Sequence, residues 1–223
     1  MKLNNVRFLS ALTALALFGV SDLRAQSQNT VPANVAGGTV PANIAGGFAK
    51  FTPVSQISSL AKAANGAMTN TTATFPMPPI AGHPVVAVLA LSPAIFPQGI
   101  FFFPIDPQSQ PAKAGDFALE GGVSVSYPQD GIALSFTDFR VDILGNLFAR
   151  ITFNGQSIGG EIQLANASAA RIGLSPDKTQ FTIIETLRVS NIFAESINKI
   201  FGATVLTPNQ QIANVDLVAD VID

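Results

Sequence analysis

The stretch FALEGGVSVSYPQDGIALSF, residues 117–136, carries the clearest fold signal in the chain. Apolar residues alternate with small or polar ones on both sides of Asp130-Gly131, a dipeptide typical of the turn between two antiparallel strands. Alternation with a period of two puts every second side chain on the same face of a strand. The stretch therefore predicts a β-hairpin with one apolar face directed toward a core.

Similar patterns continue on both sides of this hairpin. Further apolar or alternating runs occupy residues 85–91, 99–103, 139–143, 147–153, 162–164, 181–183 and 215–221. One helix is predicted over residues 190–201, with Ser190 as its N-cap and Gly202 at its end. A shorter helical pattern covers residues 54–64. We expect an all-β fold, an antiparallel β-sandwich or a partly open barrel, with one late helix and one short N-terminal helix.

The first 25 residues have the pattern of a secretory signal peptide. Lys2 and Arg7 precede an apolar run of about 13 residues, and Leu23-Arg24-Ala25 fits a cleavage site before Gln26. Because a helix needs about 20 apolar residues to cross a bilayer, we expect a removed signal and no remaining transmembrane span. The protein is then exported, to the periplasm, the cell surface or the medium.

A nine-residue phrase occurs twice in residues 30–47, as TVPANVAGG and then TVPANIAGG. Two copies are too few for a solenoid, and the proline and Gly-Gly pair in each copy suit an extended arm. We interpret residues 26–82 as a low-complexity arm and residues 83–223 as a single β-rich domain. The alternative is that the repeat docks along a sheet edge.

The charge and the residue content of the chain argue against several classes of function. Charged residues make up 12% of the chain, and no basic cluster is present, which argues against nucleic-acid binding. So low a charge content favours a surface covered by a second copy or by a cell-envelope or matrix component. The chain has no cysteine, so neither disulfides nor thiolate chemistry is available. We interpret it as an exported surface, matrix or binding module without catalytic activity, with an unrecognised extracellular hydrolase as an alternative.

Two residue types occur once each. His83 stands before a proline with no acid nearby in the sequence, which is typical of a loop residue rather than a general base. Tyr127 continues the apolar face of its strand, where a tyrosine usually closes the core and keeps its hydroxyl in solvent. Its alternative role is that of a phenolate ligand to haem iron. Asp138 and Asp142 lie four residues apart, a spacing that indicates one solvated strand face more than a catalytic acid pair.

The back two-thirds of the chain resembles a known family. Leu187, Phe193-Ala194, Ile197-Asn198 and Phe201-Gly202, followed by residues 209–215, are similar to the late helix and final strand of the Hta-type (HtaA-like) secreted domain. The resemblance covers about residues 95–222 and implies a bacterial exported or cell-surface β-rich domain. The best-known members of this family bind haem, through a tyrosine supported by histidine and other aromatic residues early in the domain.

Neither Tyr127 nor His83 aligns with that motif. The resemblance therefore implies the fold, and we expect no cofactor and no metal. A haem or other hydrophobic-ligand binder, with Tyr127 and His83 as candidate binding residues, is the alternative.

Overall fold

Antiparallel strands form most of the described chain. The structure is a computed structural model, and it describes residues 44–53, 67–69, 75–77, 87–107, 116–128 and 130–222. The predicted signal peptide, the predicted helix at 54–64, His83 and the repeat before Ile44 lie outside the described residues.

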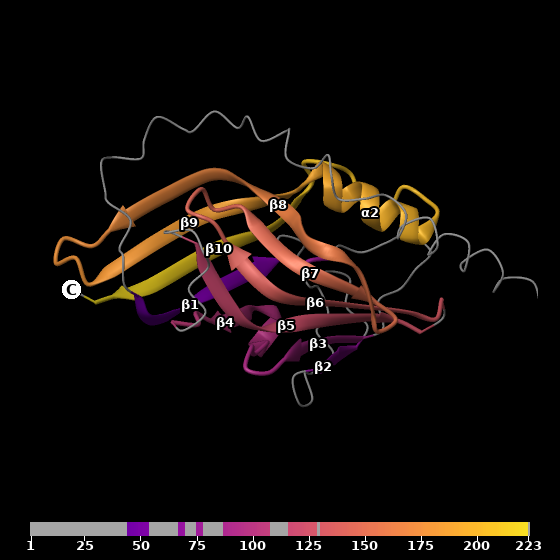
Figure 1. Cartoon of the computed structure of the whole chain (residues 1–223), viewed down its shortest axis with the longest axis horizontal. Coiled ribbons are helices and arrows are strands. Elements are labelled where there is room, and N and C mark those ends of the chain that lie inside the picture. Colours follow the sequence, from indigo (N-terminus) through magenta and orange to yellow (C-terminus); the bar gives the residue numbers. More distant parts are fainter. Residues whose placement is uncertain are drawn as a thin grey trace, which may run out of the picture.

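The described strands belong to one ten-stranded sheet with the order β2-β3-β5-β6-β7-β8-β9-β10-β1-β4 (Figure 1). Their bounds are β1 Ile44–Pro53, β2 Ala67–Thr69, β3 Ala87–Leu91, β4 Phe101–Pro104, β5 Phe117–Tyr127, β6 Ile132–Val141, β7 Leu147–Phe153, β8 Gln156–Leu174, β9 Gln180–Val189 and β10 Gln211–Val221. A short 3-10 helix, η2 (Pro97–Gly99), precedes β4. Tyr127 pairs with Ile132 across the predicted Asp130-Gly131 turn, so the hairpin predicted over residues 117–136 is confirmed.

The sheet curls into a partly closed barrel at the end of β4. The Ile105 N–H donates to the Gly47 carbonyl at 3.1 Å, and the Asp106 N–H donates to the Ala118 carbonyl at 3.0 Å. These two bonds connect the chain after β4 to β1 on one side and to β5 on the other. The predicted mainly antiparallel fold with a partly open barrel is confirmed.

β1 begins inside the second copy of the nine-residue repeat. It pairs with β10 along its length and with β4 from Phe48 to Phe51. Gly47 has φ +132°, and a Cβ at this position would lie 2.1 Å from the Val218 carbonyl oxygen, so the strand can approach β10 only with glycine here. These residues belong to the sheet, although the sequence pattern indicates an arm before residue 83.

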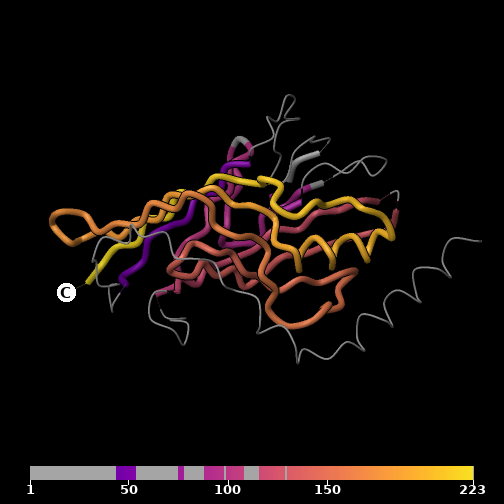
Figure 2. The backbone as a smooth tube through the Cα atoms, turned by 90° about the horizontal axis from the view of Figure 1, so that it is seen from above, coloured from indigo at the N-terminus to yellow at the C-terminus, as the bar shows by residue number. Residues whose placement is uncertain are grey.

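Helix α2 (Asn191–Phe201) lies at one end of the sheet beside β8 (Figure 1). The Phe193 N–H donates to the Ser190 side chain, and Gly202 ends the helix in the left-handed conformation, as predicted. Its buried face consists of Phe193, Ala194, Ile197, Ile200 and Phe201. At the other end, the β8–β9 hairpin extends beyond the neighbouring strands (Figure 2).

Phenylalanine rings fill the middle of the barrel. The ring of Phe51 lies 4.8 Å from that of Phe75 and 5.2 Å from that of Phe103, and Phe103 lies 5.0 Å from Phe139. All four side chains are buried. The barrel therefore encloses a packed core at this level, as small barrels do.

Candidate functional site

Tyr127 ends β5 and lies wholly inside the protein. Its side chain is 0% exposed, and its ring makes an edge-to-face contact with Phe201 at 5.5 Å between centroids. We expected the hydroxyl to reach solvent, and this expectation was wrong. Phe201, at the C-terminal end of α2, packs against the ring and covers this end of β5.

The Tyr127 hydroxyl is buried and has no hydrogen-bond partner among the described residues. Burial, and secondarily the negative charge of Asp130, raise the pKa of this phenol, which therefore stays neutral. A buried polar group without a partner costs about 1–3 kcal/mol, and such groups are rare in folded proteins. The oxygen of Tyr127 is thus an available donor and acceptor in an apolar setting.

Glu185 is a second buried polar group of this kind. It lies on β9 between the buried residues Ile183 and Leu187, is 4% exposed, and has no hydrogen-bond partner for either carboxyl oxygen among the described residues. Burial, with a smaller contribution from Asp142, raises its pKa to about 9. Glu185 is not among the candidates predicted from the sequence, although alternation from Phe181 to Val189 places it in the apolar series.

The fold keeps these two groups apart. Tyr127 pairs with Ile132 at the start of β6, whereas Glu185 lies against Gly145 in the turn that follows the end of β6. The pairing of Ala87 with Ser126 brings β3 next to the strand end that carries Tyr127. His83 precedes Ala87 by four residues but lies outside the described residues, so the structure does not place the two sequence candidates together.

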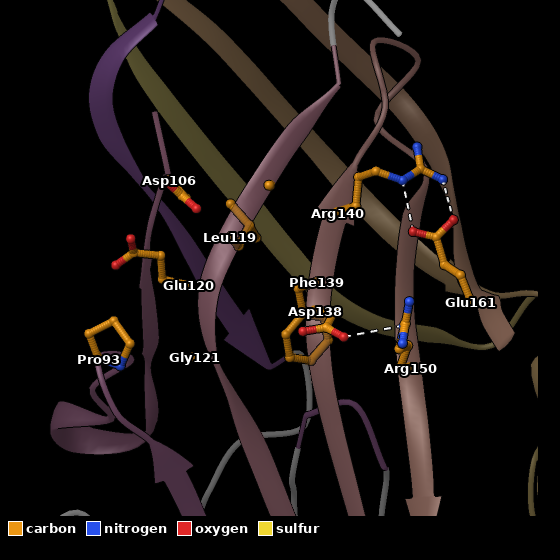
Figure 3. A pocket seen from close by; sticks show the side chains of 11 residues that line it. Pro93, Asp106, Leu119, Glu120, Gly121, Asp138, Phe139, Arg140, Arg150 and Glu161 are labelled. Atoms are coloured by element: carbon orange, nitrogen blue, oxygen red, sulfur yellow. Dashed lines mark hydrogen bonds and ion pairs between the residues drawn. The ribbon is translucent and has the colours of Figure 1, made fainter. Parts of the chain in front are cut away.

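A groove of about 820 Å³ lies where β5 to β8 meet the chain after β4. Figure 3 shows Asp106 and Glu120 on the side of the groove away from its two arginines. The full lining is Pro93, Asp106, Ala118, Leu119, Glu120, Gly121, Asp138, Phe139, Arg140, Arg150 and Glu161.

Arg140 is fixed by several contacts at this groove. Its guanidinium donates to both carboxylate oxygens of Glu161, at 2.8 and 2.7 Å (Figure 3). It also donates to Asp116. It stacks on the Phe148 ring at 4.0 Å, and the Glu161 hydrogen bond is the main reason that the pKa of Arg140 is raised. Arg140 therefore braces β6 against β8 through Glu161.

The structure gives Asp138 and Asp142 separate roles. Asp138 has φ +52° at an irregularity in β6, is exposed, and pairs with Arg150 at 3.3 Å. Asp142 accepts the N–H groups of Leu144 and Asn146 in the following turn. Asp138 and Asp142 thus form no pair aimed at a common substrate atom. The described residues also contain no group of three or more His, Cys, Asp or Glu that could hold a metal.

Comparison with known proteins gives a likeness of fold. Neither the protein-family models nor the curated proteins match this sequence. Among solved structures, the C-terminal domain of HtaA from Corynebacterium glutamicum matches with a TM-score of 0.51 and 14% identity, over 79% of this chain and 97% of that domain. This chain shares the fold of the HtaA C-terminal domain. The Hta-type resemblance in the sequence is confirmed at the level of fold.

Two further structures from the same organism match less well. The heme binding protein HtaB gives a TM-score of 0.48 and 13% identity, over 78% of this chain and 92% of that one. A domain-swapped dimer of the H434A variant of the HtaA C-terminal domain gives 0.44 and 14%, over 60% and 82%. Among the described residues, no helix is both long and apolar enough to span a membrane.

Proposed function

We propose that this chain is an exported, non-catalytic binding domain that takes haem or another flat hydrophobic ligand, with Tyr127 as the residue that contacts it. The observation that carries the proposal is the buried Tyr127 hydroxyl, which has no partner among the described residues. Export is inferred from the signal-like N-terminus, and the ligand class is taken from the best-known members of the family that the sequence resembles.

The chemistry of Tyr127 is compatible with this ligand class. A tyrosine oxygen is one of the axial ligands that proteins supply to haem iron. Bound haem would supply an iron centre whose positive charge favours the ionised phenol, against the burial that raises the pKa of Tyr127. Because the ring is fully buried, a ligand reaches the oxygen only after the surrounding chain moves aside. His83 stays a second candidate because the chain that follows it enters β3, beside Tyr127.

The test is a titration of the full secreted chain with haemin and, separately, with metal-free protoporphyrin IX. We expect a Soret shift with haemin in the wild type. Tyr127→Phe should keep the native circular dichroism and bind haemin at least about tenfold more weakly. His83→Ala reports separately on the second candidate.

Each outcome of this titration decides one part of the proposal. An unchanged haemin spectrum in Tyr127→Phe would remove Tyr127 as the iron ligand. If haemin and metal-free porphyrin bind equally well, the protein binds a hydrophobic ligand but does not ligate its iron. Absence of binding by the wild type to either porphyrin would overturn the function.

A second candidate function is self-association through the outer face of β1 and β4. Phe48 is 43% exposed and Ile95 is 58% exposed, and the Phe48 and Phe102 rings lie 6.2 Å apart. Ile95 and Phe102 exchange backbone hydrogen bonds, so their side chains belong to the same outer strip. Neighbouring exposed apolar side chains are typical of contact surfaces. Sedimentation velocity should show a dimer that Phe48→Ser disrupts, whereas a monomer at all concentrations would reject this function.

A further inference from the structure

Glu185 occupies a position in the sheet where an ionised carboxylate has no compensation. It faces the interior from β9, and its cross-strand neighbour on β10 is the buried Val215. On its other side, the β8–β9 ladder is irregular between Ser168 and Arg171, so no regular pair lies opposite Glu185. Both carboxyl oxygens lack a hydrogen-bond partner among the described residues.

The turn between β6 and β7 closes over this carboxyl. Asp142 holds the turn by accepting the N–H groups of Leu144 at 2.9 Å and Asn146 at 2.8 Å, while the Gly145 N–H donates to the Asp142 carbonyl. The Asn146 side chain also accepts the Ala167 N–H and so joins the turn to β8. Gly145 packs directly on Glu185, since a Cβ at Gly145 would lie 1.7 Å from Glu185 Oε2.

Among the described residues, the groups that face Glu185 cannot stabilise its charge. The turn contributes Asp142, whose negative charge disfavours a second carboxylate. β8 contributes Ala167 near the same contact and β10 contributes Val215, and neither side chain titrates. An ionised Glu185 beneath the closed turn would therefore be buried, unpaired and next to a like charge.

We propose that Glu185 and the β6–β7 turn form a proton-controlled latch at one end of the barrel. The turn stays closed over the neutral carboxyl and opens to water when the carboxyl ionises. The latch lies at the far end of β6 from Tyr127, so it is independent of the proposed ligand function.

The two states of the latch differ in how strongly the carboxyl holds its proton. With the turn closed, burial raises the pKa of Glu185 to about 9, and with the turn open the group returns toward its ordinary value of 4.5. Between these two values, opening is coupled to the loss of one proton. The open population of the turn should therefore rise about tenfold for each pH unit.

The experiment is hydrogen exchange of the full secreted chain without haemin, read for the turn at residues 142–146 between about pH 5.5 and 8.5. Protection factors remove the intrinsic hydroxide dependence of exchange. In the wild type they should fall about tenfold per pH unit in this turn, and in Glu185→Gln they should stay constant. Glu195→Gln changes an exposed acid on α2 and should keep the wild-type slope.

Two results would overturn the latch. One is a turn whose protection in the wild type does not change with pH. The other is the same slope in Glu185→Gln as in the wild type, which would assign the opening to another group. A flat wild-type profile overturns the latch even if the variant does not fold, and the absence of haemin keeps this result separate from the ligand titration.

Discussion

The carboxyl of Glu185 occupies the space that a side chain at Gly145 would need. A Cβ built on Gly145 would lie 1.7 Å from Glu185 Oε2, and Gly145 itself has φ +86°. A residue of β9 and a residue of the β6–β7 turn therefore depend on each other, although they are far apart in the sequence. The turn can close only while position 145, the fourth residue after the end of β6, has no side chain.

Gly145→Ala should destabilise the protein more than Gly155→Ala does. Gly155 is the matched control, because it has a similar φ of +80° and nothing within 4 Å of its built Cβ. Gly155→Ala should lower the free energy of unfolding by about 1–2 kcal/mol, because alanine is strained in the left-handed backbone conformation. Gly145→Ala should lower the free energy of unfolding by about 1–3 kcal/mol more than that, because its Cβ overlaps with Glu185.

Urea unfolding at constant pH measures both glycine variants. The double variant Gly145→Ala with Glu185→Ala should show a smaller excess cost than expected from adding the two single changes. Equal costs for the two glycine variants would contradict the packing of Glu185 against the turn.

The stability of the whole fold should fall as the pH rises. Glu185 has its pKa raised in the folded state to about 9, against 4.5 for the free group, so the folded state keeps a proton that the unfolded state has released. Below about pH 4.5 both states are protonated and the effect is absent. Above that value the free energy of unfolding should decrease by up to about 1.4 kcal/mol per pH unit, and the decrease should end near pH 9.

Unfolding midpoints in urea across this pH range check the prediction. Glu185→Gln should flatten the profile and should be more stable than the wild type at pH 8, because the amide never ionises. Glu195→Gln should leave the profile unchanged. A wild-type profile that rises between about pH 5 and 8 would contradict the buried, unpaired state of Glu185.

Arg140 and Arg150 should differ widely in their contribution to stability, although both line the same groove. Arg140 is mostly buried between Glu161 and Asp116, whereas Arg150 and Asp138 are mostly exposed. Arg140→Ala should lower the free energy of unfolding by about 2–3 kcal/mol, and Arg150→Ala should lower it by less than about 1 kcal/mol. Arg140→Lys should lie between them, because lysine keeps the charge but loses the two-pronged contact with Glu161. Thermal and urea unfolding measure these losses. Equal losses of stability in the two alanine variants would contradict the role of Arg140 in bracing β6 against β8.

Local chemistry explains which elements the sequence predicts well. Helix α2 was predicted with both its ends, since Ser190 and Gly202 act on backbone groups within one turn of themselves. The β5–β6 hairpin likewise depends on alternation and on a neighbouring Asp-Gly turn.

Features that depend on distant contacts were not predictable from the sequence. The Ile-Ala-Gly-Gly start of β1 has the sequence pattern of an extended arm, and it becomes a central strand only because Val218 and Ile105 approach Gly47. The burial of the Tyr127 hydroxyl depends on Phe201 at the end of a helix much later in the chain. The sequence therefore predicts the fold and singles out Tyr127, but it cannot predict that this phenol is enclosed without a partner.

The central claim is that the buried Tyr127 hydroxyl serves a ligand rather than the core. The most direct test measures the free energy of unfolding of the wild type and of Tyr127→Phe, each with and without excess haemin. Without haemin, Tyr127→Phe should be as stable as the wild type or about 1 kcal/mol more stable, because the change removes a buried hydroxyl without a partner among the described residues. With haemin, the wild type should gain stability through binding to the folded state, and the variant should lose most of that gain. A variant that is less stable without haemin and gains as much from haemin as the wild type would contradict the claim.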